Sequence, residues 1–230
     1  MIKQFGGNSA GRDFIVGDIH GCFSRLQARL DQMGFDPSRD RLFSVGDLVD
    51  RGPESELALE WLAQPWFHAV RGNHEQMAVD AAKGMYDPRT YAANGGQWFM
   101  DLPTMRQKAF AAAFDELPIA IELETADGLV GIVHANCPDD WADFPEYLKD
   151  DVFGMLAMWS RERIQQERHI PVAGVRAVVV GHTPLQRPVI LGNVYHIDTG
   201  AVFQGHDFTI LDAATLKPVA LAGPALDWAA

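Results

Sequence analysis

The sequence predicts an α/β fold in which two β-sheets pack together and helices cover their outer faces. In the first half of the chain, short apolar segments that end in glycine alternate with segments of helical periodicity, which is typical of a parallel sheet. The second half is richer in predicted strands, so we expect it to supply a second sheet. No internal repeat and no linker rich in Ser, Gly or Pro divides the 230 residues, and a single domain spanning 1–230 is expected.

The first half reads as three consecutive strand and helix pairs. Residues 13–17 (DFIVG) form an apolar run that ends in glycine, and residues 22–34 carry apolar side chains at helical spacing up to Gly34. The other predicted strands of this half lie at 41–46 and 67–72, and the other predicted helices at 54–64 and 75–84. This order predicts a mostly parallel sheet with helices on its faces.

The second half begins with a less regular helical stretch. Residues 85–116 are interrupted near Gly95-Gly96 and at Pro103, and we expect them to form a small helical cap. A further helix is predicted at about 151–168. The remaining predicted strands lie at 117–124, 129–135, 176–181, 194–200 and 208–213.

Composition limits the classes of function. The net charge of −12 disfavours general binding to nucleic acid or acidic membranes, because both attract basic surfaces. An anion-binding site in this chain needs local positive charge, which metal cations supply. Only Cys22 and Cys137 are present, so free thiols are expected. Without a signal-peptide core or an apolar run of about 20 residues, we expect a soluble, cytoplasmic monomer.

Side chains that can bind metals follow the ends of five predicted strands. The five segments are VGDIHG (16–21), VGDLVDRG (45–52), RGNHE (71–75), IVHAN (132–136) and VGHTP (180–184). A turn, a helix cap or a core histidine explains any one of them, but not their joint occurrence. Because loops after the carboxyl ends of parallel strands line one crevice, we expect these groups to converge.

The converging groups are oxygen and imidazole ligands without a thiolate. They are Asp18, His20, Asp47, Asn73, His134 and His182. Such a set suits Mn²⁺, Fe or Zn²⁺ better than a soft ion. Six ligands are too many for one catalytic ion with open positions, so they predict two ions about 3.5–4 Å apart, as used for in-line phosphoryl displacement. Asp47 is the predicted bridging ligand.

Taken in order, GDIHG, GDLVDRG, GNHE, VHA and GHTP resemble the PPP superfamily of metallophosphoesterases, and among them the bacterial and phage serine/threonine protein phosphatases of bacteriophage lambda type. The resemblance covers nearly the whole chain, including PWFHAVRGNHEQM, MWSRERI and IDTGAVF. It implies a sandwich of two β-sheets flanked by helices, with a dinuclear metal site at the sheet edge. It also implies that Asp18 and His20 bind the first ion, Asn73, His134 and His182 the second, and Asp47 both.

The resemblance further implies roles for the residues around the phosphoryl group. Arg51 and Arg161 would hold the phosphoryl oxygens beside Asn73, and His74 would be the general acid with Asp50 as its orienting partner. Two cations and two guanidiniums neutralise a phosphate dianion that otherwise repels its nucleophile. A hydroxide that bridges the metal ions would attack phosphorus directly, without a phosphoenzyme.

The implied function is a Mn²⁺-dependent phosphatase for phosphoserine and phosphothreonine in proteins or peptides, with phosphotyrosine, phosphohistidine and small aryl phosphates as further substrates. The alternative is a symmetrical Ap4A-type dinucleoside polyphosphate hydrolase of the same superfamily. That branch often lacks the second Asp of GDLVDRG and commonly has GNHD, so Asp50 and Glu75 favour the protein phosphatase. An inactive metal-binding adaptor is a remote third possibility, because no ligand, arginine or acid is missing.

Two positions depart from the family pattern, and other conspicuous residues have structural explanations. Asn136 follows the VHA motif where relatives often have Asp or Gly, and Ser160 stands where Asn is commoner. Further histidines and tryptophans are expected to be structural, solvated or packed in the core or cap: His68, His169, His196, His206, Trp61, Trp98 and Trp159.

Overall fold

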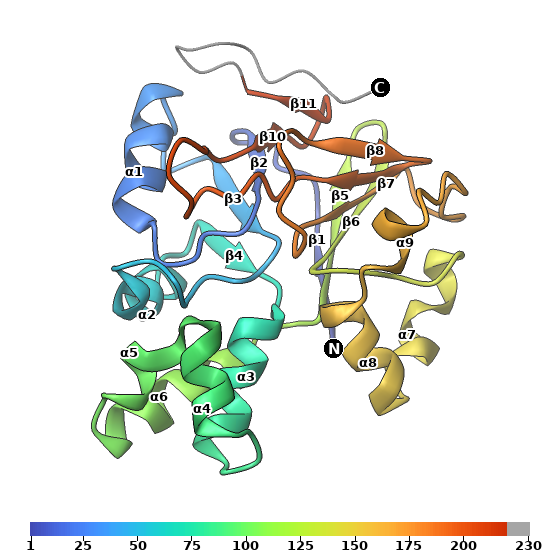
Figure 1. Cartoon of the computed structure of the whole chain (residues 1–230). Helices are drawn as coiled ribbons and strands as arrows, with labels where there is room; N and C mark the ends of the chain where they lie inside the picture. The colour runs from blue at the N-terminus through green and yellow to red at the C-terminus, as the bar shows by residue number, and fades with distance from the viewer. Residues whose placement is uncertain (220–230) are drawn as a thin grey trace.

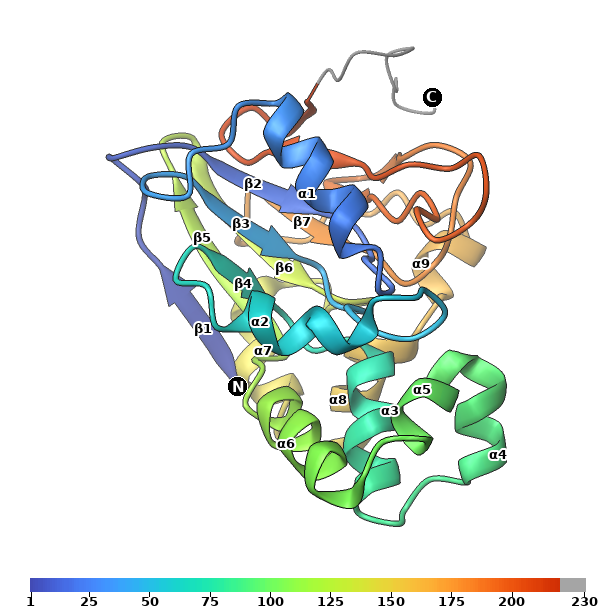
Figure 2. The ribbon, with the colours of Figure 1, turned by 90° about the vertical axis from the view of Figure 1, so that its left-hand side faces the viewer.

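The computed structural model describes residues 1–219, in which two β-sheets pack face to face between layers of helices (Figure 1 and Figure 2). Helices α1 (Phe23–Gln32) and α2 (Ala58–Leu62) cover the outer face of one sheet, and α7 (Phe144–Tyr147) and α8 (Asp151–Trp159) cover that of the other. The predicted fold class is therefore confirmed. Residues 220–230 of the predicted domain lie outside the described part.

The first sheet has five strands in the order β11-β10-β2-β3-β4. They are β2 (Asp13–Val16), β3 (Arg41–Ser44), β4 (Phe67–Ala69), β10 (Ile210–Asp212) and β11 (Lys217–Pro218). Strands β2, β3 and β4 run parallel and lie within the three strands predicted from the first half of the sequence. Strand β10 joins the edge of β2 in the antiparallel direction.

The second sheet has six strands in the order β1-β5-β6-β7-β9-β8. They are β1 (Ile2–Phe5), β5 (Ala120–Thr125), β6 (Gly128–Val133), β7 (Ala177–Val180), β8 (Val189–Leu191) and β9 (Val194–His196). The strand predicted at 194–200 ends at His196, although the Ile197 N–H still donates to the carbonyl oxygen of Val180 in β7. Strands β1, β8 and β11 were not predicted, since runs of two to four residues carry no clear alternation.

The core between the sheets follows from the alternation of side chains along each strand. Phe43 of β3 meets Ile132 of β6 and Val179 of β7 in one buried cluster between the sheets. Their chain neighbours Leu42 and Val178 point the other way, into the two clusters beneath the outer helices. Strands that are buried on both faces read as continuous apolar runs, which is why they were predictable.

The remaining helices follow the predicted pattern with two corrections. They are α3 (Asn73–Ala82), α4 (Pro88–Tyr91), α5 (Gln97–Met100), α6 (Thr104–Asp115) and α9 (Glu162–Gln165). The helix predicted at 151–168 is interrupted by extended backbone at Ser160, which separates α8 from α9. The helix predicted at 54–64 is a 3₁₀ turn (Ser55–Leu57) followed by α2. Within residues 1–219, no helix has both the length and the apolar character required to cross a bilayer.

Residues 85–116, the helical segment, lie beside α3 at one end of the sandwich (Figure 2). The break predicted near Gly95-Gly96 is a kink within Ala92–Gly96, where the backbone of Gly95 is not helical and has a φ of 103°. The segment is helical, as expected, and its function as a cap stays a prediction.

Candidate dinuclear metal centre

Asp47 lies at the centre of the site, in the loop that follows β3. Its Oδ1 atom is 3.3 Å from Nε2 of His134, and its Oδ2 atom is 3.7 Å from Nε2 of His20. The Asp18 Oδ2 atom is 4.0 Å from the same His20 nitrogen. Asp47 thus lies between two groups of donors, which is the position predicted for a bridging ligand.

The second group of donors surrounds the side chain of Asn73, in the first turn of α3. Its Oδ1 atom lies 3.0 Å from His134 Nε2 and 2.9 Å from His182 Nδ1. The ligand atoms of Asp47, His134 and His182 all lie within 4.8 Å of one another, and so do those of Asp47, His20 and His74. The structure therefore brings the six predicted ligands together, and their binding of two ions stays a prediction.

The histidines of the cluster are oriented by the backbone. Each donates one ring N–H to a backbone carbonyl oxygen, with a nitrogen–oxygen distance of 2.8–3.0 Å. The acceptor of His20 is Val49, that of His134 is Val45, and that of His182 is Trp159. The other ring nitrogen then presents a lone pair to the centre of the cluster. This is how proteins fix the tautomer of a metal-binding imidazole.

Glycines precede the candidate ligands because a side chain would occupy the space of a carboxylate. A Cβ atom on Gly72 would lie 2.2 Å from Oδ1 of Asp47, and one on Gly181 would lie 2.0 Å from Oδ1 of Asp18. Neither carboxylate could keep its position if Gly72 or Gly181 were replaced by a residue with a side chain. The glycines that drew attention in the sequence therefore make room for the site.

The backbone is strained at the same positions. Seven non-glycine residues within 1–219 have a positive φ, and five of them are predicted site residues: His20, Asp47, Asp50, Arg51 and His182. Left-handed backbone is costly for such residues and persists where the surrounding packing enforces it. The loops are thus held in bent conformations that aim their side chains at one point.

Glu75 supports the Asp47 loop, a role that sequence reasoning missed. Its carboxylate is fully buried and accepts hydrogen bonds from the backbone N–H groups of Gly72 (2.9 Å), Asp47 (2.9 Å) and Leu48 (2.7 Å). Burial and the nearby Asp47 raise the pKa of Glu75 to about 7. Its place in the first turn of α3, three residues after the glycine N-cap, was the available signal.

The electrostatics of the cluster fit divalent cations. Burial and the neighbouring carboxylates of Asp198 and Asp47 raise the pKa of Asp18 well above its usual value. Asp198 is 2% exposed, and its Oδ2 atom has no hydrogen-bond partner within residues 1–219. Burial lowers the pKa of both His20 and His182 to about 3, which keeps their lone pairs free. The neutral imidazoles of His20 and His182 beside these buried carboxylates are donors that a divalent metal ion requires.

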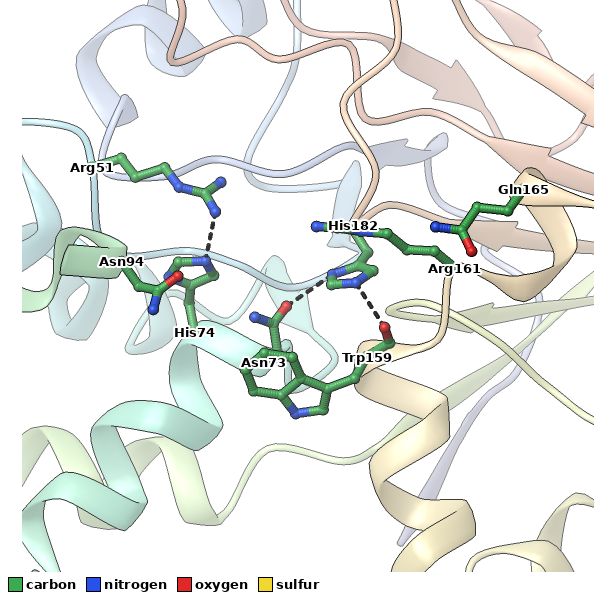
Figure 3. A pocket seen from close by; sticks show the side chains of 8 residues that line it. All are labelled: Arg51, Asn73, His74, Asn94, Trp159, Arg161, Gln165 and His182. Carbon is green, nitrogen blue, oxygen red and sulfur yellow. Dashed lines mark hydrogen bonds between the residues drawn. The ribbon is translucent and has the colours of Figure 1, made fainter. Parts of the chain in front are cut away.

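A cavity of about 420 Å³ opens beside the cluster. It is lined by Arg51, Asn73, His74, Asn94, Trp159, Arg161, Gln165 and His182. Figure 3 shows Arg51 and His74 on one side of the cavity and Arg161 on the other. Asn94 and Gln165 were not predicted to be site residues, and Trp159, expected from the sequence to be packing, also forms part of this wall.

His74 is fully engaged at the edge of the cavity. Its Nδ1 atom lies 2.7 Å from Oδ2 of Asp50, and both side chains are buried. Its Nε2 atom accepts a hydrogen bond of 2.9 Å from Arg51, as Figure 3 shows. The imidazole is thus held by a carboxylate behind it and faces the cavity through its other nitrogen.

The two departures from the family pattern contact each other. The Asn136 side chain donates to Oγ of Ser160 over 3.3 Å, and the same oxygen accepts from the backbone N–H of Glu162 over 3.3 Å. These bonds bracket the turn that carries Arg161. Although Asn136 and Ser160 both differ from the family pattern, Arg161 still lines the cavity.

Comparison with known proteins shows which family the chain belongs to. The model of the calcineurin-like phosphoesterases matches residues 14–207, which include every predicted site residue. The chain belongs to the calcineurin-like phosphoesterase family. This phosphoesterase is 43% identical over 195 residues to serine/threonine-protein phosphatase 1 of Salmonella typhimurium, covering 84% of this chain and 88% of that one.

Two further likenesses are to one sequence relative and to one solved structure. A symmetrical bis(5'-nucleosyl)-tetraphosphatase of Aromatoleum aromaticum is 36% identical over 137 residues, which are 57% of this chain and 46% of that protein. The cold-active protein-tyrosine phosphatase of a Shewanella species superposes with a TM-score of 0.60 at 17% identity, over 93% of this chain and 78% of that one. The second likeness concerns the fold alone.

Replacing the bridging carboxylate tests the metal site. Asp47→Asn removes one charge and one ligand atom from both candidate ion positions, so we expect metal affinity to fall roughly 10-fold or more. Elemental analysis after dialysis against Mn²⁺ would measure the ions per chain. Asp36→Asn, at a carboxylate that is 46% exposed, is the matched control. An Asp47→Asn protein that keeps two ions per chain would contradict the assignment.

Proposed function

We propose that this phosphoesterase is a metal-dependent protein phosphatase that hydrolyses phosphoserine and phosphothreonine. The observation that carries the proposal is the buried Asp50–His74 pair facing a cavity beside the six-donor cluster. An acid at this place serves a substrate whose leaving group is a strongly basic alkoxide. The identity of 43% to a serine/threonine-protein phosphatase across most of both chains supports the same substrate class.

The proposed cofactors are two divalent ions, Mn²⁺ in the first place and Fe or Zn²⁺ as alternatives. Asp18 and His20 would hold one ion, Asn73, His134 and His182 the other, and Asp47 both. When bound, the ions would neutralise phosphoryl charge and lower the pKa of a bound water toward about 7. The mixed oxygen and nitrogen donors support this choice of metals.

Arg51 and Arg161 would bind the phosphoryl oxygens from opposite sides of the cavity. In the structure, Arg51 donates to ring nitrogens of His20 and His74. Phosphoryl oxygens are stronger acceptors than neutral imidazoles, so a bound phosphate would draw the guanidinium toward itself. His74 Nε2 would then be free to hold the proton that the leaving group needs.

His74 would deliver that proton from Nε2 while Asp50 holds Nδ1. No protein nucleophile is needed, and the nearest thiol supports none. Cys22 is 6% exposed, and burial raises the pKa of its thiol. We therefore propose direct hydrolysis without a phosphoenzyme, with phosphotyrosine, phosphohistidine and small aryl phosphates as further substrates.

The wider organisation is proposed on the same basis. One domain would carry the site, with residues 85–116 as its cap, and Asn94 of that segment lines the cavity. A monomer in the cytoplasm that acts on phosphorylated proteins or peptides agrees with the acidic composition and the two buried free cysteines.

A substrate panel separates the two enzyme candidates. With Mn²⁺, we expect kcat/KM for a phosphoserine peptide to exceed that for diadenosine tetraphosphate at least about 10-fold, because the site provides an acid for an alkoxide. Phosphate release is the measurement, and EDTA should abolish it. Preference for the dinucleotide would favour the tetraphosphatase, and no turnover with any divalent ion would favour the adaptor.

His74→Asn should lower kcat for the phosphopeptide by about 10²–10⁴-fold, the usual contribution of a positioned general acid. Metal content should stay at the wild-type level, since the predicted ligands are unchanged. His169→Asn, at an exposed histidine, is the control and should be near neutral. Turnover of His74→Asn within a factor of three of wild type would refute the acid role.

Loss of either guanidinium should weaken phosphate binding. We expect Arg51→Ala and Arg161→Ala each to raise the inhibition constant of inorganic phosphate by about 10- to 100-fold, because a charge-assisted hydrogen bond is worth roughly 1.5–3 kcal/mol. Product-inhibition kinetics would measure it, with Arg39→Ala, at a side chain 60% exposed, as control. An unchanged constant in both variants would count against the assignment.

A further inference from the structure

Asp50 receives two hydrogen bonds from the helical segment, at the oxygen that does not face His74. The indole N–H of Trp98 donates to Asp50 Oδ1 over 2.6 Å, and the Tyr91 hydroxyl donates to the same atom over 3.2 Å. The other oxygen, Oδ2, is the one that pairs with His74. Asp50 is 0% exposed, so the two aromatic side chains take the place that water would have at a surface carboxylate.

The backbone of the helical segment comes equally close to this loop. A Cβ atom on Gly95 would lie 2.5 Å from the backbone nitrogen of Arg51, and one on Gly96 would lie 2.3 Å from the ring of Tyr91. The turn at Gly95 therefore rests on the backbone of Arg51, whose N–H donates to the Gly95 carbonyl oxygen over 3.5 Å. Gly95 permits that contact, and Gly96 leaves room for the ring of Tyr91, so a side chain at either position would displace one of these contacts.

The two donors are themselves fixed in place. Tyr91 is fully buried and packs against the ring of Phe99 at 5.7 Å, and Trp98 packs edge-on against Phe110 at 5.1 Å. Burial, followed by the nearby Asp50 carboxylate, raises the pKa of the Tyr91 hydroxyl, which therefore remains a donor. Trp98, expected from the sequence to be packing alone, thus combines packing with a directed hydrogen bond.

We infer that Tyr91 and Trp98 are positioning residues for the general acid: they hold Asp50 so that it aligns His74 with the leaving oxygen. The inference rests on the proposed phosphatase function and adds a role for the helical segment. In the reaction, a water oxygen bonds to phosphorus while the bond from phosphorus to the leaving oxygen breaks. The leaving oxygen takes the proton from His74 Nε2. The proton that the attacking water loses then protonates His74 again.

This role predicts a dependence on the leaving group. A serine alkoxide is strongly basic and requires the proton, whereas p-nitrophenolate leaves as a stable anion. Misalignment of His74 should therefore slow hydrolysis of a phosphoserine peptide and spare p-nitrophenyl phosphate. A change that merely loosens the fold or the metal site would slow both substrates alike.

The experiment compares Trp98→Phe and Tyr91→Phe with the wild-type protein on both substrates in the presence of Mn²⁺. We expect kcat for the phosphopeptide to fall about 10-fold in Trp98→Phe, a part of the 10²–10⁴-fold that a general acid supplies, and kcat for p-nitrophenyl phosphate to fall less than about 3-fold. KM and metal content should not change. Trp61→Phe is the matched control, because Trp61 packs among Phe23, Trp66 and Phe67 in another aromatic cluster.

A double variant completes the test. If Trp98 acts through His74, Trp98→Phe should cause no further loss in a His74→Asn background, since residues that act as a unit are not additive. Equal losses on both substrates, or a further loss in the double variant, would overturn the inference. Tyr91→Phe, which removes only one oxygen atom, provides the same comparison if Trp98→Phe does not fold. Wild-type protein that hydrolyses neither substrate would instead overturn the proposed function.

Discussion

The structure depends on a cluster of buried carboxylates that form no salt bridge with a lysine or arginine of the described residues. Asp18, Asp47, Glu75 and Asp198 are all at most 3% exposed. Within residues 1–219, Asp18 and Asp47 pair with histidines and with no lysine or arginine, and no ion pair involves Glu75 or Asp198. Uncompensated carboxylates inside a protein are costly, and bound divalent cations remove that cost. Metal binding and the stability of the loops are therefore expected to be coupled.

The same constraint explains the local sequence around the site. The carboxylates pack over glycines such as Gly72 and Gly181, where no side chain fits, and five site residues adopt left-handed backbone. Such conformations cost energy wherever they occur outside glycine. The two sheets, with the apolar cluster between them, supply the stability that holds the loops in place. The buried core between the sheets therefore offsets the cost of the strained loops at the site.

Much of this was predictable because the signals are local. Apolar runs that end in glycine marked β2, β3 and β4, and ligand chemistry marked the six donors that converge around Asp47. The rest depends on contacts between distant segments. Trp98 lies 48 residues from Asp50 in sequence, and the hydrophobic periodicity of the sequence does not indicate that the Trp98 N–H donates to the Asp50 carboxylate. Short edge strands such as β1 exist only because a neighbouring strand pairs with them.

The arrangement separates two demands of phosphoryl chemistry. In a chain with a net charge of −12, the loops of the sandwich must concentrate positive charge for the phosphoryl group, through Arg51, Arg161 and the proposed cations. The helical segment acts on the other side of the reaction, because it contacts Asp50 and so the group proposed to protonate the leaving oxygen. When a dinucleoside polyphosphate is cleaved between phosphates, the leaving oxygen belongs to a phosphate, a weaker base than an alkoxide. Such a substrate therefore depends less on a general acid than a phosphoserine peptide does.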